Sequence, residues 1–227
     1  MHPELILFDC DGVLVDSEVL SIGGVVSVLN EAGIPATYDM IARYFGMKQA
    51  DIMLKVSEET GHDIGNEVLA RIWPALRDRF EAELKPMPGL ADFLRRHPET
   101  KRCVASSSGL DRIRNSLRLT GLAPFFGDDI FSSSQVARGK PAPDLFLFAA
   151  AKMDVAPDRC VVIEDSRFGV AGALAAGMKA LGFSGGSHIE PQHARALAEA
   201  GALYVERDWE GVEARLFAGS GRDAGEA

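Results

Sequence analysis

The sequence places two aspartates directly after a short apolar run near its start. The run from Leu5 to Phe8 contains no glycine or proline, and Asp9 and Asp11 follow it with one residue between them. Such a run predicts a strand buried on both faces, as in a parallel sheet. Because side chains alternate along an extended chain, both carboxylates are expected on one side of the strand end. Like charges this close need a shared proton or a divalent cation, and hard oxygen ligands favour Mg²⁺.

Simpler explanations compete for the same residues. Aspartate and glycine form a turn after many strands without binding anything. A calcium-binding EF-hand loop is excluded, because it carries glycine at its sixth position, whereas Gly12 comes fourth when Asp9 is counted as the first. Cys10 lies between the aspartates and has the chemistry of a nucleophile, but alternation turns it away from them. The rest of the chain must therefore decide between a turn and a catalytic metal site.

Three further loops carry groups suited to phosphate or metal. Ser106, Ser107 and Ser108 follow a predicted strand and open a helix, where the Ser106 hydroxyl and the Ser107 and Ser108 amides could bind an anion, although helix-capping serines have the same pattern. Lys140 lies in a proline-rich loop where it could bind phosphate, although a lone loop lysine is usually solvated. Glu164 and Asp165 end another strand, where a turn is the simpler explanation.

Each of these signals is weak alone, but a parallel sheet would bring them together. The carboxyl ends of its strands lie along one edge, where open α/β folds bind their ligands. The residues expected in this crevice are Asp9, Asp11, Ser106, Lys140, Glu164 and Asp165. Four carboxylates would repel one another unless a dication and the lysine neutralised them. That charge balance suits a phosphate bound with Mg²⁺.

The elements that position these loops predict an α/β protein with a doubly wound, Rossmann-like parallel sheet. Strand and helix patterns alternate from Arg102 onward, whereas the segment before it is helical. We expect residues 1–16 and 87–218 to form the α/β catalytic core domain, and residues 17–86 to form a helical cap domain inserted after the first strand. Residues 219–227, rich in Gly, Ala and charge, are expected to be a disordered tail.

Composition narrows the class of protein. The chain has 227 residues, of which 47% are hydrophobic, so it can bury a substantial core. Its net charge of −9 disfavours nucleic acid and anionic membranes as partners. No apolar run approaches a membrane span and the first strand leaves no room for a signal peptide, so we expect a cytoplasmic protein. The three cysteines all fall in or beside predicted strands, where they are expected to be buried thiols.

At its four loops the chain resembles the haloacid dehalogenase superfamily of aspartate-nucleophile phosphotransferases. Asp9-Cys-Asp-Gly-Val-Leu-Val-Asp-Ser-Glu18 matches the first motif, Ser106 the second, Lys140 in Gly-Lys-Pro-Ala-Pro-Asp the third, and Glu164-Asp165 the fourth. Their order and spacing also agree, so the resemblance extends over residues 4–217, and the helical insertion is similar to that superfamily's cap. The closest likeness is to the branch that contains β-phosphoglucomutase and small sugar-phosphate phosphatases.

The resemblance implies a Mg²⁺-dependent phosphatase that hydrolyses a small phosphate monoester, such as a sugar or polyol phosphate, through an aspartyl-phosphate. Asp9 would attack phosphorus, and Asp11 would protonate the departing alcohol and then take a proton from water. The acid role of Asp11 leads to the hypothesis that its pKa is raised.

The resemblance also implies the ligands and the selectivity residues. Mg²⁺ would bind Asp9, the main-chain carbonyl of Asp11, Glu164 and Asp165. The oxygens of the transferring phosphate would bind Ser106, the Ser107 amide and Lys140. The cap residues expected to contact the rest of the substrate are Glu18, Lys48 and Gln49. Hinges are expected near Asp16 and Pro86 to Pro88, and a monomer is the family's usual state.

Other branches of the superfamily fit less well. Dehalogenases lack the second aspartate, and phosphonate-cleaving relatives use a cap lysine, whereas no lysine lies between Asp9 and Lys48. β-Phosphoglucomutase carries a cap histidine and a cap arginine where Ser21 and Gln49 are the nearest residues here. Without that arginine a second phosphate loses its bidentate partner, so hydrolysis is favoured and a phosphosugar mutase is the alternative. A non-catalytic phosphate-binding protein would not need Asp11 as well as Asp9.

Overall fold

The computed structural model describes residues 2–189 and 192–217, and they contain one six-stranded parallel sheet in the order β3-β2-β1-β4-β5-β6. Its strands are β1 Leu5–Phe8, β2 Arg102–Ser106, β3 Ile130–Ser132, β4 Cys160–Glu164, β5 Lys179–Phe183 and β6 Tyr204–Glu206. In the middle of the sheet Leu7 pairs with Cys103 on one side and with Val162 on the other. The order reverses at β1, which is where doubly wound folds bind ligands. The predicted fold class is confirmed.

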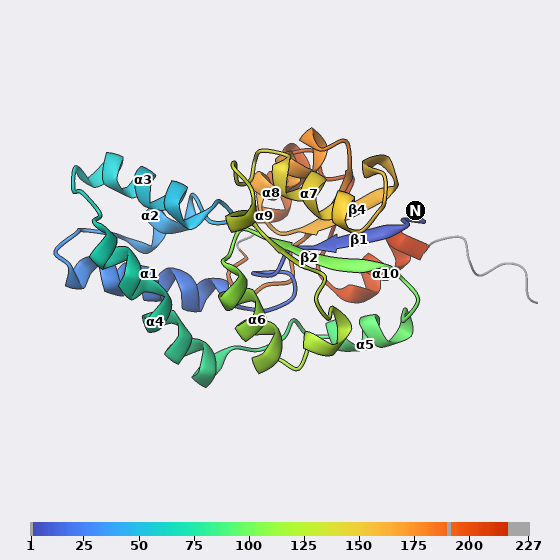
Figure 1. The fold of residues 1–227 in the computed structure, drawn as a ribbon, viewed down its shortest axis with the longest axis horizontal. Coiled ribbons are helices and arrows are strands. Elements are labelled where there is room, and N and C mark those ends of the chain that lie inside the picture. The colour runs from blue at the N-terminus through green and yellow to red at the C-terminus, as the bar shows by residue number, and fades with distance from the viewer. Residues whose placement is uncertain (1, 190–191, 218–227) are drawn as a thin grey trace, which may run out of the picture.

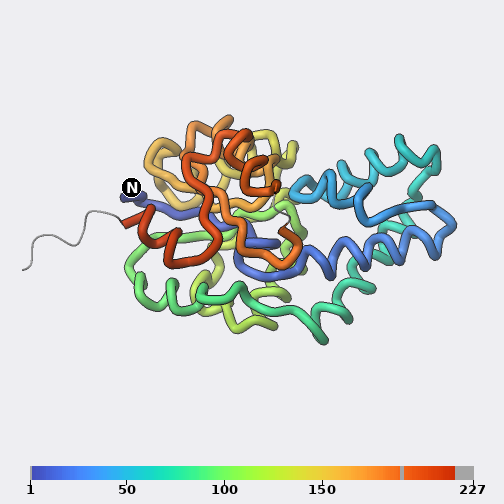
Figure 2. The backbone as a smooth tube through the Cα atoms, turned by 180° about the vertical axis from the view of Figure 1, so that it is seen from behind, coloured from blue at the N-terminus to red at the C-terminus, as the bar shows by residue number. Residues whose placement is uncertain are grey.

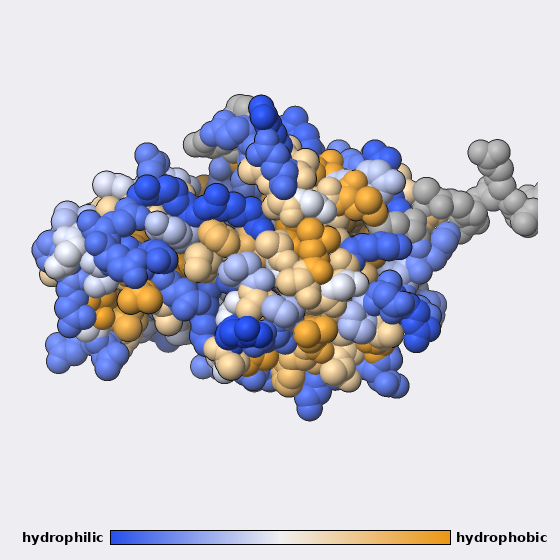
Figure 3. All heavy atoms as spheres, turned by 90° about the horizontal axis from the view of Figure 1, so that it is seen from above, coloured by the Kyte–Doolittle hydropathy of each residue, from blue (hydrophilic) through white to orange (hydrophobic). Residues whose placement is uncertain are grey.

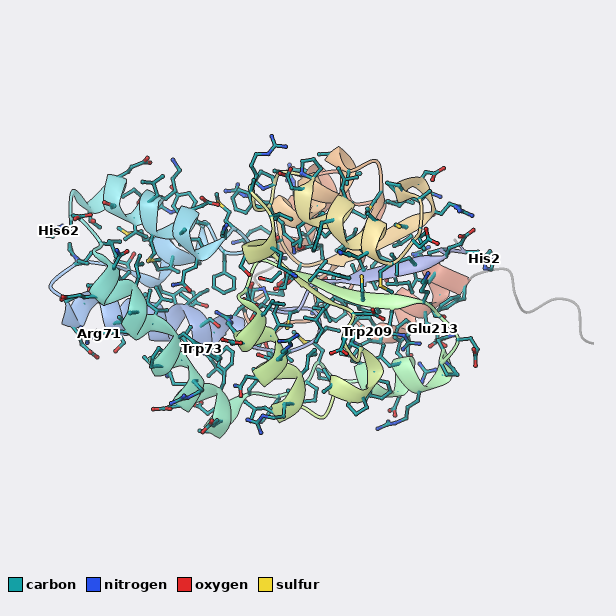
Figure 4. All side chains as sticks on the ribbon, viewed as in Figure 1. His2, His62, Arg71, Trp73, Trp209 and Glu213 are labelled. Atoms are coloured by element: carbon teal, nitrogen blue, oxygen red, sulfur yellow. The ribbon has the colours of Figure 1, made fainter. Side chains whose placement is uncertain are left out.

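Both faces of the sheet are covered because alternate residues of each strand point to opposite sides. Ile6 and Phe8 join one apolar cluster, and Leu5 and Leu7 join the other. The helices over the first face are α5 Leu90–Arg96, α6 Leu110–Leu119 and α10 Trp209–Phe217. Those over the second face are α7 Asp144–Lys152, α8 Arg167–Ala175 and α9 His193–Glu199 (Figure 1). On the first face Trp209 of α10 lies 6.0 Å from Phe8, measured between ring centroids (Figure 4).

A helical unit between β1 and α5 stands apart from the sheet and has its own apolar cluster (Figures 1 and 2). Its helices are α1 Glu18–Glu31, α2 Tyr38–Ala42, α3 Gln49–Thr60 and α4 Asn66–Glu83. The chain segments that enter and leave this unit lie side by side, because Asp16 N donates to Lys85 O at 3.0 Å and Val15 forms a bridge with Pro86. Hydrophilic residues cover much of the face of this unit drawn in Figure 3, as its apolar residues face inward.

Local contacts set the bounds of two short elements. α2 starts at Tyr38 because Thr37 Oγ1 accepts a hydrogen bond from Met40 N at the helix start, and it ends at Ala42. β6 starts at Tyr204, which is in register with Leu181 of β5. The tail expected at residues 219–227 lies outside the described residues. Of the helices that the structure describes, none is long and apolar enough to cross a membrane.

Candidate active site

Lys140 is buried at the carboxyl edge of the sheet and joins two carboxylates. Its Nζ donates to Asp9 Oδ1 at 2.6 Å, to Ala105 O at 3.0 Å and to Glu164 Oε1. Burial alone would lower the pKa of Lys140, but Asp9 and Glu164 raise it above its ordinary value. The side chain is 1% exposed, so Lys140 is a fixed positive charge rather than a solvated loop lysine.

Three carboxylates beside Lys140 could hold a divalent cation. Asp9, Glu164 and Asp165 each offer one oxygen, and these oxygens lie within 4.8 Å of one another. Burial and its acidic neighbours raise the pKa of Asp165 well above its usual value, and burial raises the pKa of Asp9 to about 8 against the opposing effect of Lys140. Asp165 Oδ2 is buried and accepts no hydrogen bond among the described residues, and Nε2 of His188 lies 3.4 Å from it. The three carboxylate oxygens fit a hard divalent cation.

The loop after β1 approaches Asp165 closely because it contains a glycine. Gly12 has a φ of +78°, a conformation that side chains with a Cβ rarely adopt. A Cβ built at this position would lie 1.7 Å from Asp165 Oδ2. Glycine is therefore needed both for the backbone conformation and for the space beside the acidic cluster.

Asp11 is held by three donors and not by Lys140. Its Oδ1 accepts from Ser17 Oγ and from Arg112 Nη2, both at 2.5 Å, and its Oδ2 accepts from Ser108 Oγ at 2.6 Å. Burial opposes the charge, but Arg112 and the two serines hold the pKa of Asp11 below its usual value. The hypothesis that the pKa of Asp11 is raised is therefore wrong for this arrangement. The sequence pattern did not show that Arg112 of α6 lies beside this carboxylate.

The serine loop after β2 faces the same crevice. Ser106 is 1% exposed and its Oγ accepts from Ser108 N at 3.2 Å. Ser107 Oγ donates to Gly46 O of the helical unit at 2.7 Å. The N-cap of α6 is Gly109, and no described side chain caps this helix, so the helix-capping explanation of the serines does not hold.

A cavity of about 80 Å³ lies between the sheet edge and the helical unit. The predicted site residues that line it are Asp9, Asp11, Glu18, Gln49, Ser106, Ser107 and Asp165. Lys140 and Glu164 do not line the cavity themselves. Lys140 bonds both to Glu164 and to Asp9, and Asp9 lines the cavity. Lys48 is not among the lining residues. It packs against Gly139, because a Cβ built on Gly139 would lie 3.0 Å from the Cβ of Lys48.

Sequence reasoning missed several residues of this site. Arg112, Ser17 and Ser108 bind Asp11, and His188 Nε2 lies 2.6 Å from Glu18 Oε2. Ser17 lies in the same motif as Asp11, and Ser108 lies in the serine loop expected at the same sheet edge, so both could have been predicted to lie near Asp11. Arg112 and His188 come from a helix and a distant loop, and nothing in their local pattern distinguishes them from other surface residues.

Cys10 is turned into the core, as alternation predicted. It is 1% exposed and packs in the apolar cluster on the first face of the sheet. Burial and the neighbouring aspartates raise the pKa of its thiol well above the usual value, which makes it a poor nucleophile. Cys103 and Cys160 are also free and buried.

Known proteins share this fold and these loops. The family model for haloacid dehalogenase-like hydrolases matches residues 3–177. A 6-phosphogluconate phosphatase from Escherichia coli is 31% identical and aligns over 83% of this chain and 86% of that protein. A β-phosphoglucomutase from Bacillus subtilis is 30% identical over 80% and 83%, respectively. The crystal structure of a conserved haloacid dehalogenase-like protein of unknown function from Agrobacterium tumefaciens is 40% identical, with a TM-score of 0.79 over 95% of this chain and 98% of that chain.

The family match covers the strands and loops that carry the acidic cluster and the lysine. The matched range also contains the four helices of the helical unit, and the family includes sugar-phosphate phosphatases. The chain is an enzyme that belongs to the haloacid dehalogenase-like hydrolases.

Proposed function

We propose that the protein is a Mg²⁺-dependent phosphatase that hydrolyses a small phosphate monoester, a sugar or polyol phosphate, through an aspartyl-phosphate on Asp9. The observation that carries the proposal is the buried contact of Lys140 with Asp9, beside two further carboxylates that could share a cation with it. The likeness to a 6-phosphogluconate phosphatase supports a small phosphorylated sugar as the class of substrate.

In the first half-reaction an Asp9 oxygen attacks phosphorus and the bond from phosphorus to the ester oxygen breaks. An ionised carboxylate needs no base to activate it, and Lys140 together with a bound cation would favour this form of Asp9 against the burial that raises its pKa to about 8 in the metal-free protein. The departing alkoxide takes its proton from Asp11, so this half-reaction uses the protonated form of Asp11, which is the minor form in the ligand-free protein because Arg112 and two serines lower its pKa. The product is a free alcohol and phosphorylated Asp9.

In the second half-reaction water attacks the phosphorus of the aspartyl-phosphate. Asp11 accepts a proton from that water, a role that suits the ionised form favoured by Arg112. The bond between Asp9 and phosphorus breaks, inorganic phosphate leaves and the Asp9 carboxylate is restored. Ser106, the Ser107 amide and Lys140 bind the phosphate oxygens during both steps.

The metal proposed for this site is Mg²⁺, held by Asp9, the Asp11 main-chain carbonyl, Glu164 and Asp165. When bound, the cation supplies positive charge beside the nucleophile and the transferring oxygens. This assignment rests on the close oxygens of Asp9, Glu164 and Asp165, and on Asp165 Oδ2, which is buried and accepts no hydrogen bond among the residues with described positions. The protein's own part is to hold these oxygens in a buried, rigid cluster.

We further propose that residues 17–86 act as a cap over the core formed by residues 1–16 and 87–218, with hinges at Asp16 and at Pro86 to Pro88. Closure of the cap excludes water from the crevice, and its residues contact the leaving group. Glu18 and Gln49 line the cavity and are the proposed selectivity residues, whereas Lys48 would need to move to reach it. The proposed working form is a monomer.

A phosphosugar mutase of the β-phosphoglucomutase type is the second candidate, because Arg112 lines the cavity and offers a cation that a second phosphate would need. Hydrolysis is favoured because the cap position nearest to the mutase arginine is Gln49, whose neutral side chain cannot pair with a second phosphate as a guanidinium does.

Phosphate release from purified protein tests the proposal. The panel contains hexose phosphates, 6-phosphogluconate, glycerol phosphate and phosphoglycolate, each with Mg²⁺ and with a chelator, while isomerisation of β-glucose 1-phosphate is followed in parallel. We expect metal-dependent release of phosphate from at least one sugar or polyol phosphate and none from the Asp9→Asn variant. Isomerisation without phosphate release would establish the mutase instead, and full activity of Asp9→Asn would refute the mechanism.

A further inference from the structure

Arg112 contacts the catalytic carboxylate and the cap at the same time. It lies in the first turns of α6, and its Nη2 donates to Asp11 Oδ1 at 2.5 Å and to Ser21 Oγ at 2.8 Å. Its guanidinium carbon lies over the ring of Phe80, 5.1 Å from the centroid. The arginine side chain is only 14% exposed, so these contacts exclude most of the solvent.

The partners of Arg112 come from both sides of the proposed hinge. Asp11 belongs to the loop after β1, whereas Ser21 lies on α1 and Phe80 on α4, both in the helical unit. Ser21 is fully buried and Phe80 is 1% exposed, so both are held in the packing of the helical unit. If the cap swings away from the core, both residues move away from Arg112 with it. The full set of contacts can therefore form only while the helical unit lies against the core.

The cap and core also meet at a second point, but that contact does not reach the proton donor. Ser107 Oγ donates to Gly46 O, and an added Cβ on Gly46 would lie 2.5 Å from Ser166. These contacts close the crevice around the phosphate loops. The Arg112 contact differs because one end of it is the carboxylate that must serve the leaving oxygen.

We propose that Arg112 is a positioning residue that couples closure of the cap to the placement of Asp11 beside the leaving oxygen. The proposal rests on the proposed function, since it requires Asp11 to act on the leaving group. In the closed form Arg112 and Ser17 fix Oδ1 of the carboxylate, while Ser108 fixes Oδ2. When the cap opens, the arginine loses Ser21 and Phe80, and with them the support that orients its guanidinium toward Asp11.

Two other roles for Arg112 make different predictions. A guanidinium that only fills space against Phe80 would affect stability and all substrates alike. A guanidinium that binds the substrate directly is also conceivable because Arg112 lines the cavity, and its loss would then raise KM. A positioning residue for Asp11 should instead lower kcat, and only where the leaving group needs a proton.

The test compares an alkyl phosphate, 6-phosphogluconate or whichever sugar phosphate is the best substrate, with p-nitrophenyl phosphate, whose leaving group needs little protonation. Full-length protein with Mg²⁺ is assayed as wild type, Arg112→Met, Arg112→Lys and Arg118→Met. Arg118 is an exposed residue of the same helix that bonds only to Asn115 in the described contacts, so it is the matched control.

For Arg112→Met we expect kcat on the alkyl phosphate to fall about 100-fold and kcat on the nitrophenyl ester to fall less than about fivefold, with little change in KM. Arg112→Lys should recover part of the loss because it restores the charge, and Arg118→Met should match the wild type. In an Asp11→Asn background, Arg112→Met should have almost no further effect on the alkyl phosphate.

An equal loss on both esters, a change confined to KM, or a full additional loss in the Asp11→Asn background would overturn the inference. If Arg112→Met does not fold, Ser21→Ala removes the hydrogen bond from Arg112 to the cap, together with the bond from Ser21 Oγ to Ser17 O, and should show the same selective loss at about five- to tenfold. Wild-type protein that releases no phosphate from either ester would refute the proposed function itself. Active wild type with an unselective Arg112→Met variant would refute the coupling alone.

Discussion

The sheet edge and the helical unit line the same cavity but are built differently. At the sheet edge Lys140, Glu164 and Asp165 are each no more than 2% exposed, and Lys140 is bonded directly to Asp9 and Glu164. On the helical side the lining is mostly apolar, from residues such as Ile41, Phe45, Met47 and Met53, with Gln49 at its exposed margin. The comparison shows that the sheet edge is built from buried ionic contacts, whereas the helical side is built from apolar side chains, of which Ile41 and Met53 also belong to that unit's own apolar cluster.

The largest effect should come from Asp9, the proposed nucleophile. We expect Asp9→Asn to lower phosphate release by at least about 1,000-fold, because the amide cannot attack phosphorus as an ionised carboxylate does. The variant should stay folded, since it removes a carboxylate whose pKa burial raises to about 8. Initial rates measure the loss of phosphate release, and a thermal melt shows whether the variant is folded. A residual rate above a tenth of wild type would place the chemistry elsewhere.

Removal of the buried lysine should affect stability as well as rate. Lys140→Met leaves Asp9 and Glu164 buried without their common cation, which should cost about 3–5 kcal/mol of unfolding free energy. Urea unfolding in the absence of metal measures this loss of unfolding free energy. Lys152→Met, at an exposed position on α7, is the control and should change stability by less than about 0.5 kcal/mol. Equal stability of the two variants would show that the ionic cluster is not structurally important.

The proton donor should be sensitive to the leaving group. We expect Asp11→Asn to lower kcat on alkyl phosphates by about 100-fold or more and on p-nitrophenyl phosphate by much less. The reason is that nitrophenolate departs without a proton, whereas an alkoxide does not. Parallel kinetics on the two esters check this prediction. Equal losses on both would argue that Asp11 has a structural or metal-binding role only.

The stability of the metal-free protein should fall as pH rises. Burial raises the pKa of Asp9 from 3.8 to about 8, so the folded state binds this proton more tightly than the unfolded state. The stabilisation is complete below the unfolded pKa and is lost as the pH rises through about 8. Melting temperatures between pH 5 and 8.5 should drop by about 5 °C without metal and by less with Mg²⁺. The slope should be smaller in Asp9→Asn.

The smallest effect is expected on the helical side of the cavity. Gln49→Ala should change KM for a sugar phosphate by less than about tenfold and leave kcat on p-nitrophenyl phosphate almost unchanged, because Gln49 is exposed and lies outside the ionic cluster. Stability should stay within about 0.5 kcal/mol of wild type. Steady-state kinetics on both esters measure the difference. A loss as large as that of Asp11→Asn would erase the distinction between the two sides.

Local pattern predicted the sheet edge well because each of its loops follows a strand. Asp9, Ser106 and Glu164 all stand at or directly after the end of a parallel strand, and the rule that such ends share one edge was sufficient to bring them together. The cap side was less predictable. Lys48 and Gln49 are neighbours at the start of α3, yet Gln49 lines the cavity and Lys48 does not. The packing of α3 decides which of these two side chains faces the cavity, and this packing cannot be read from the local spacing of residues.

The amino-acid sequence by itself determined the alternation of strands and helices, the apolar faces of β1 and the identity of the charged residues at the strand ends. These follow from hydrophobic period and from chain order, which are local properties. Only the tertiary structure decided that Arg112 contacts Asp11 and that His188 contacts Glu18. Such pairs join residues about 100 or more positions apart, so their distances, and the lowered pKa of Asp11 that depends on Arg112, exist only once the chain has folded.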